Sequence, residues 1–273
     1  MPLLATQRRV LAWDAPGYGG SAPLPMDQPR AADYANAALA WMAAAQVRSP
    51  IVIGHSLGAL IAAAVAAAVA AAVATAAAQE LDPLSGLILA SPAQGYAKAT
   101  PAVREAKFND RVAALRSLGI ARMAAERSAR LCAPGASAAV LARVRDNMLQ
   151  ITERGYTQAA WMLAHDDIDA HLASAYRSQC ASQNASQCVS PATSQRASRP
   201  TALSPTLTIL CGELDLVTPC LPSRALAERH GAAFQVLPAV GHACYVEDPG
   251  SFAAALLAAI GSLSSTAPQA SHA

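Results

Sequence analysis

The sequence predicts an α/β fold: a mainly parallel sheet flanked by helices and interrupted once by a helical insert. Short apolar runs alternate with helical segments towards both ends of the chain, which is the pattern of a parallel sheet. The middle of the chain carries helical segments and no strand candidate. The 273 residues are 53% hydrophobic and 14% charged, so the chain can bury a large core and is not disordered as a whole.

Five apolar runs predict the strands of this sheet. Each is bounded by proline, glycine or polar turn residues, as expected for short buried parallel strands. They cover residues 9–14, 49–54, 86–90, 206–211 and 233–237. Helices are predicted between and after them, over residues 33–46, 57–79, 221–230 and 249–260.

The spacing of the strands divides the chain into a core and an insert. The strands fall within residues 1–91 and 205–261, which form the predicted core. Residues 92–176 mix arginine and glutamate with alanine and leucine, and predict a helical cap with breaks at residues 133–135 and near Gly155.

Two further segments lack the apolar period of a helix or strand. Residues 177–204 are rich in serine, glutamine, alanine and proline, and predict a flexible linker or surface excursion. Residues 262–273 predict a disordered tail.

The alanine-rich run from Leu57 to Ala78 contains no charged residue and is long enough to cross a bilayer. Alanine contributes little to membrane transfer, and few larger apolar residues accompany it. The run is better interpreted as a helix buried on nearly all sides, with small side chains that let it lie close to a sheet. No membrane partner is expected.

Charge and cysteine usage exclude several classes of protein. The net charge is +2, so no nucleic-acid partner is expected. None of the six cysteines forms a C-x-x-C pair, and a chain of this length needs no disulfides. No signal peptide opens the chain, so free thiols in a cytoplasmic protein are predicted, without a cofactor.

Residues 54–58 read Gly-His-Ser-Leu-Gly, which fits G-x-S-x-G. The motif alone is weak, but a predicted strand precedes it and a predicted helix follows it. In that setting a sharp turn lifts the hydroxyl of Ser56 clear of the sheet, while Gly54 and Gly58 leave room for close backbone approach. The amino end of the helix then faces the reacting oxygen.

A serine nucleophile needs a base, and the base needs an orienting carboxylate. His242 and Asp215 both lie in loops after predicted strands, where open α/β sheets place their sites. Glu213 and Asp14 are alternative carboxylates for the role of Asp215. His55 adjoins the serine and is expected to be structural.

Other residue groups were weighed as sites. His165, Asp169 and His171 suggest a metal site, but their spacing is not ideal, and a solvated helix end is favoured with no metal. Trp161 and Met162, in the predicted cap, are candidates for lining a substrate pocket, although core packing explains them equally well.

Four motifs, WDAPGYGGS, IGHSLG, CGELDLVTP and GHACYVEDP, stand in the order in which they occur in the α/β-hydrolase superfamily. The chain resembles a cap-bearing member of that superfamily over most of residues 9–91 and 205–260. The resemblance implies that Ser56 is the nucleophile, His242 the general base and Asp215 the residue that orients it. The backbone N–H of Leu57 would be one oxyanion-hole donor. Cys244 lies close to the histidine and is expected to pack in the core.

The resemblance also implies an element that this chain does not show. In the family, a strand ending in a His-Gly loop precedes the strand equivalent to residues 9–14, lies between it and residues 49–54, and supplies the second oxyanion-hole donor. That donor is absent here, so an N-terminally truncated fold is expected, with Met1 an internal methionine of a longer protein. The alternative is direct pairing of residues 9–14 with residues 49–54.

The resemblance implies a serine hydrolase that cleaves a small or medium carboxylic ester or lactone through an acyl-enzyme. Two alternatives stay open at this point. One is a carbon–carbon bond hydrolase, or a cofactor-free haloperoxidase-like enzyme, of the same fold. The other is a truncated, non-catalytic remnant of a hydrolase.

Overall fold

A computed structural model describes residues 2–74, 82–176 and 206–265. Its sheet has the order β1-β2-β3-β4, with all neighbouring strands parallel. The strands are β1 (Ile51–His55), β2 (Gly86–Ala90), β3 (Thr206–Gly212) and β4 (Ala233–Leu237). The predicted parallel α/β sheet is therefore confirmed.

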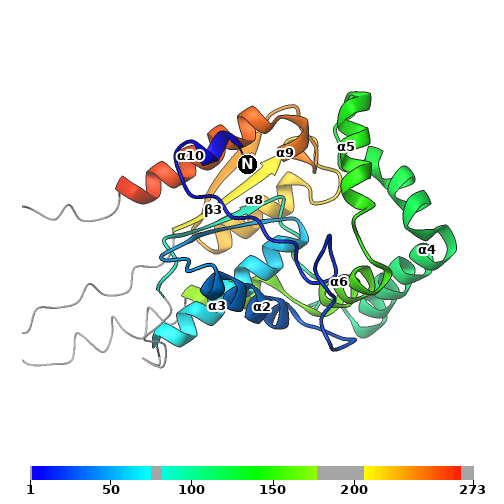
Figure 1. The fold of residues 1–273 in the computed structure, drawn as a ribbon, viewed down its shortest axis with the longest axis horizontal. Coiled ribbons are helices and arrows are strands. Elements are labelled where there is room, and N and C mark those ends of the chain that lie inside the picture. The colour runs from blue at the N-terminus through cyan, green and yellow to red at the C-terminus, as the bar shows by residue number, and fades with distance from the viewer. Residues whose placement is uncertain (1, 75–81, 177–205, 266–273) are drawn as a thin grey trace, which may run out of the picture.

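Side chains of the central strand β2 alternate between two apolar layers. Leu87 and Leu89 face one buried cluster, and Ile88 and Ala90 face the other. All five residues of β2 are buried, because helices cover both faces of the sheet (Figure 1). This is why the strand reads as a continuous apolar run rather than an alternating one.

One layer of helices comprises α2 (Ala31–Ala44), α3 (Leu57–Ala74) and α8 (Cys220–Arg229), which share a core cluster with the sheet. On the opposite face lie α1 (Pro2–Ala5) and α10 (Pro249–Ser265), side by side in Figure 1. The short helix α9 (Cys244–Glu247) precedes α10.

Helix α3 is long and apolar enough to cross a membrane by length and composition. In the fold it packs against α2, β1 and β2. Every residue from Ala59 to Ala66 is buried, and the small alanine side chains let α2 and the sheet approach closely. The alanine run is therefore explained as a core helix.

Between β2 and β3 the chain forms a helical insert, made of α4 (Pro101–Ser128), η1 (Ala129–Leu131), α5 (Ala138–Met148), α6 (Glu153–His165) and helical residues 168–176. In Figure 1, α4 and α5 lie at the right, beyond the sheet. The predicted break at residues 133–135 separates η1 from α5. The break expected near Gly155 lies between α5 and α6, because α6 begins at Glu153, before Gly155. An unpredicted kink occurs in α4 at Gly119, whose φ is +70°.

The predicted strand at residues 9–14 is wrong, because this segment is not a strand and pairs with none of the strands in the part of the chain that the structure describes. Its side chains bind α2 instead: the Arg9 guanidinium donates to the carbonyl of Ala45 at 2.9 Å, and the rings of Trp13 and Trp41 lie 6.0 Å apart. The alternative of direct pairing between this segment and β1 does not occur either.

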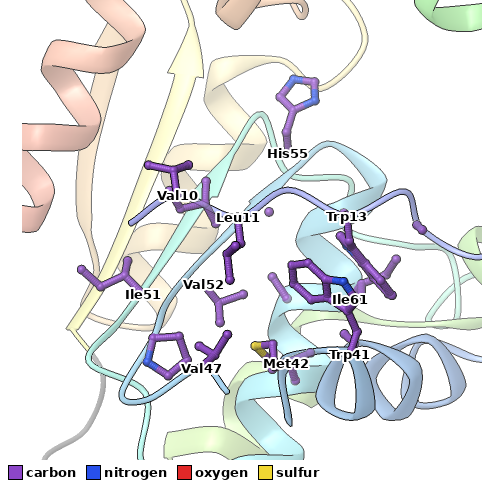
Figure 2. A pocket seen from close by; sticks show the side chains of 18 of the residues that line it. Val10, Leu11, Trp13, Trp41, Met42, Val47, Ile51, Val52, His55 and Ile61 are labelled. Carbon is purple, nitrogen blue, oxygen red and sulfur yellow. The ribbon is translucent and has the colours of Figure 1, made fainter. Parts of the chain in front are cut away.

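A cavity of about 1280 Å³ lies between residues 9–14 and β1. Figure 2 shows Val10 and Leu11 on one side of it and Ile51 and Val52 on the other. A separation at this position was expected from the order of strands in the family. Among the described residues, β1 therefore pairs with β2 alone, and Ile53 is 41% exposed.

Several predicted boundaries shift by a few residues. The last helix continues to Ser265, so the described structure overturns a disordered tail that starts at 262. The predicted linker at residues 177–204 and the remainder of the tail lie outside the described residues, as does the end of the alanine helix beyond Ala74.

Candidate active site

Ser56 occupies the single residue between β1 and α3. Its φ is +52°, a conformation that is strained for a residue with a side chain. The turn is held by three backbone hydrogen bonds. The N–H of Ser56 donates to the carbonyl of Ala90 at 2.9 Å, and the carbonyl of Ser56 accepts from Ala59 at 3.0 Å and from Ala93 at 3.1 Å. The serine is therefore presented at the carboxyl end of the sheet.

Two glycines flank this turn for different reasons. A Cβ on Gly54 would lie 2.4 Å from the carbonyl oxygen of Gly58 and 2.8 Å from the Cα of Ala59. Close approach of strand and helix thus requires glycine at 54. A Cβ on Gly58 would meet nothing within 4 Å, so the close approach of the strand to its backbone does not require glycine at 58. Gly58 instead borders the cavity.

His242 lies in the loop after β4, with 5% of its surface exposed. Its Nε2 is 2.8 Å from the Oγ of Ser56, and its Nδ1 is 2.9 Å from the Oδ2 of Asp215. A carboxylate only accepts hydrogen bonds, which places the ring hydrogen on Nδ1. Nε2 is then free to accept the hydroxyl hydrogen of Ser56.

Asp215 lies in the loop after β3, and its side chain is fully buried. Its Oδ1 accepts from the backbone N–H groups of Val217 and Thr218, both at 2.8 Å. Burial acts to raise the pKa of Asp215, but hydrogen bonding and charge attraction from His242, with the N–H of Thr218, outweigh it and hold the pKa at about 2. The carboxylate stays ionised beside the imidazole.

The two rival carboxylates point elsewhere. Glu213 accepts from the backbone N–H of Ala239 at 2.9 Å. Asp14 accepts from the backbone N–H of Gly20 at 3.2 Å. Asp215 is thus the carboxylate that the fold brings to the histidine ring.

His55 has a contact that the sequence did not reveal. Its Nε2 is 2.8 Å from the carbonyl oxygen of His242; since a carbonyl only accepts, Nε2 donates. The two rings lie 4.9 Å apart. Burial, and then the charge of His242, lower the pKa of His55 to about 4. A neutral His55 therefore anchors the backbone of His242.

Glu247, in α9, is a second contact that sequence reasoning missed. Its two carboxylate oxygens accept from the backbone N–H of Gly241 at 2.9 Å and of Ala133 at 2.7 Å. One carboxylate thereby joins the histidine loop to the helical insert. No motif spacing identifies this role, because it depends on how two loops meet.

The residues considered for a metal have other partners. Asp169 accepts from Lys98 and His230, each at 2.8 Å, and from Arg229 at 3.1 Å. The described residues contain no group of three or more His, Cys, Asp or Glu side chains that could hold a metal ion.

His171 and His165 are occupied in a similar way. His171 lies 3.0 Å from the carboxylate of Asp166, which also binds Arg30. His165 contacts the carbonyl of Trp161 at 3.0 Å and stacks on its ring. The predicted solvated helix end is instead a network that joins the insert to the core.

Four further residues that the sequence singled out lie in different surroundings. Met162 is fully buried and lines the cavity, whereas Trp161 packs edge-on against Phe108 within the insert. Cys244 is buried. Leu57 begins α3, so its N–H is one of the first four in a helix, which have no intrahelical acceptor.

The large cavity reaches this site, since Ser56, Leu57 and Gly58 line it together with residues of the 9–14 segment and β1. A family model described as the alpha/beta hydrolase family matches residues 1–255. The chain belongs to the alpha/beta hydrolase family. The resemblance drawn from the four motifs is confirmed.

Solved structures from this fold are similar over most of the chain. An esterase from Thermogutta terrifontis is 20% identical, with a TM-score of 0.68 over 91% of this chain and 78% of its own. A hydrolase from Pseudomonas aeruginosa is 22% identical, with a TM-score of 0.69 over 95% and 82%. An enol-lactonase from Burkholderia xenovorans is 18% identical, with a TM-score of 0.68 over 95% and 84%. At these identities the likeness shows the fold, and no curated protein matches.

Proposed function

We propose that this α/β hydrolase is a serine hydrolase that cleaves a small or medium carboxylic ester or lactone through an acyl-enzyme. The observation that carries the proposal is the chain of hydrogen bonds from Ser56 through His242 to Asp215, at 2.8 and 2.9 Å. A serine hydroxyl is a weak nucleophile until a positioned base accepts its hydrogen.

In the first half of the reaction, Ser56 Oγ attacks the carbonyl carbon while His242 Nε2 accepts the hydroxyl hydrogen. The imidazolium that forms is stabilised by the ionised carboxylate of Asp215, which does not itself take the proton. His242 then returns the hydrogen to the leaving alkoxide, and the acyl group stays on Ser56. In the second half, His242 accepts a hydrogen from the water that attacks the acyl carbon. The bond to Ser56 Oγ then breaks, His242 returns the hydrogen to Oγ, and the acid product leaves.

The oxyanion of each tetrahedral intermediate needs hydrogen-bond donors. Leu57 is the donor that we assign, because its N–H lies at the amino end of α3, next to the nucleophile. Each such donor contributes about 10²–10³ in rate.

The substrate class rests on the cavity beside Ser56. Its lining includes the apolar side chains of Met162 and Ile61 and the ring of Tyr245, which suit the hydrocarbon part of an acyl or lactone group. The similarity in fold to an esterase and an enol-lactonase supports this class. The four cysteines of the described residues are free thiols, in keeping with a proposed cytoplasmic location.

The test is hydrolysis of p-nitrophenyl esters together with labelling by a fluorophosphonate, followed by identification of the labelled peptide. The wild-type protein should hydrolyse the ester and label at Ser56, and Ser56→Ala should lose both. The matched control is Ser117→Ala, which removes an exposed hydroxyl on α4 and should behave as wild type.

Folded protein that neither labels nor turns over would sink the proposal in favour of a non-catalytic protein. Labelling at Ser56 without ester hydrolysis, but with cleavage of a diketone, would move the substrate class to carbon–carbon bonds.

A further inference from the structure

Thr218 has a contact pattern that the proposed Ser-His-Asp mechanism does not explain. Its hydroxyl oxygen lies 2.8 Å from Asp215 Oδ2, 3.1 Å from His242 Nδ1 and 3.0 Å from the carbonyl oxygen of Ser91. The residue stands in the loop between β3 and α8, and the thiol of Cys211 contacts its carbonyl at 3.4 Å. The hydroxyl therefore touches both groups that activate Ser56.

The hydrogens at this point can be counted. His242 Nδ1 carries its hydrogen towards Asp215, so the lone pairs of the Thr218 oxygen can only accept from that nitrogen. The hydroxyl of Thr218 has one hydrogen, while Asp215 Oδ2 and the carbonyl of Ser91 both accept and both lie within 3.0 Å. One hydrogen is thus shared between a charged and a neutral acceptor.

We infer that Thr218 is a positioning residue that adjusts the charge on Asp215 during the reaction; the inference rests on the proposed function. While His242 is neutral, the hydroxyl donates to Asp215 Oδ2, because hydrogen bonds to a charged acceptor are the stronger ones. When His242 takes the hydrogen of Ser56, its Nδ1–H binds Oδ2 more tightly, and the hydroxyl turns to the carbonyl of Ser91. Thr218 thereby donates a hydrogen bond to the Asp215 carboxylate while His242 is neutral, and withdraws that hydrogen bond when the imidazolium forms.

A pH profile can report this effect without interference from neighbouring groups. The titratable side chains that act on Asp215 or His242 are His55, Cys211 and Cys244. The pKa of His55 is lowered to about 4, chiefly by burial. Burial raises the pKa of the Cys211 thiol well above its usual range and that of Cys244 to about 12. Between pH 5 and 9, roughly the working range of a histidine base, none of the three changes charge.

The experiment compares Thr218→Val, which keeps the β-branched shape without the hydroxyl, with Thr218→Ser, which keeps the hydroxyl. With a p-nitrophenyl ester at a pH on the acid limb of the kcat profile, T218V should lose about tenfold in kcat, equivalent to ~1.4 kcal/mol, with KM unchanged and with a plateau at higher pH no lower than that of wild type. Without the threonine donor, Asp215 favours protonated His242 more strongly, so the acid limb of the kcat profile should move to higher pH. T218S should stay within about twofold of wild type.

The low-field proton NMR signal of the His242 Nδ1–H gives a readout that does not require turnover, and it should shift in T218V but not in T218S. If T218V does not fold, Thr218→Cys, with a weak S–H donor, should show the same changes. A T218V protein with wild-type kcat, pH profile and NMR signal would overturn the role, as would a T218S protein impaired like T218V. Wild-type protein that fails to label at Ser56 marks failure of the proposed function instead.

Discussion

At the scale of single residues, Gly54 is expected to be essential and Gly58 replaceable. In Gly54→Ala the new methyl group would lie 2.4 Å from the carbonyl oxygen of Gly58, so strand and helix must separate and Ser56 must move. We predict a loss of about 1–3 kcal/mol of unfolding free energy and more than tenfold slower fluorophosphonate labelling. Urea unfolding and timed labelling measure the two effects.

Gly58→Ala is the matched control, since the added methyl group meets nothing within 4 Å. It should fold at least as stably as wild type, because alanine is the better helix former by about 1 kcal/mol. If Gly54→Ala and Gly58→Ala were labelled at equal rates, the separation of strand and helix in Gly54→Ala would not have disturbed Ser56. Glycine at position 54 would then not be required for the geometry of the serine.

Residues of the site differ in how far the sequence reveals them. Ser56, Asp215 and His242 each follow a predicted strand, and the shared edge of a parallel sheet is enough to bring such residues together. Thr218 stands in one of the same motifs, but its role depends on a side-chain rotamer and on the carbonyl of Ser91. No periodicity encodes either, so only the folded loop displays them.

At the scale of elements, the strands β2, β3 and β4 match their predicted runs to within one residue, because each run is largely apolar and is bounded by turn residues. The segment at residues 9–14 has the same composition and forms no strand. A segment forms a strand only when a neighbouring segment supplies its hydrogen-bond partners, and the composition of the one segment does not show whether it has such a neighbour. The kink at Gly119 is also unpredictable, since an isolated glycine is tolerated inside a helix.

The contact of α9 with the helical insert supports a prediction for Glu247. Glu247→Ala leaves the N–H groups of Gly241 and Ala133 without their acceptor, and each such loss costs about 1–3 kcal/mol when buried. We expect a matching loss of unfolding free energy in urea and slower labelling of Ser56, because Gly241 adjoins His242.

Glu247→Gln keeps one acceptor oxygen and should lie between E247A and the wild type in both measurements. If E247A were destabilised but labelled Ser56 at the wild-type rate, the carboxylate would stabilise the insert without positioning His242.

At the scale of the whole molecule, Asp169 links distant parts of the chain. It lies in the last described helical segment of the insert and contacts Lys98 at the start of the insert. It also contacts Arg229 and His230 at the end of α8. Its carboxylate is the shared acceptor of two cationic side chains and a histidine. These bonds therefore tie the start of the insert and its helical residues 168–176 to the carboxyl end of α8.

This network predicts how stability depends on pH. Although burial acts to raise the pKa of Asp169, hydrogen bonds from Lys98, Arg229 and His230 lower it to about 2, below the value of about 3.9 expected in the unfolded chain. A carboxyl with a depressed folded pKa contributes stability that is present above the unfolded value and is lost as pH falls through the folded one. The melting temperature should thus be level near neutral pH and fall between about pH 4 and 2.

Asp169→Asn separates this contribution from that of Asp215, whose pKa is also about 2. The variant should melt below wild type at pH 7, and the difference should narrow as pH approaches 2, because wild-type Asp169 is then protonated as well. Asp110→Asn, at an exposed carboxylate on α4, is the control and should track wild type throughout. The charge of the carboxylate would not be what stabilises the insert if the melting temperature of D169N differed from that of wild type by the same amount from pH 7 to 2. Packing or neutral hydrogen bonds of the side chain would then be responsible.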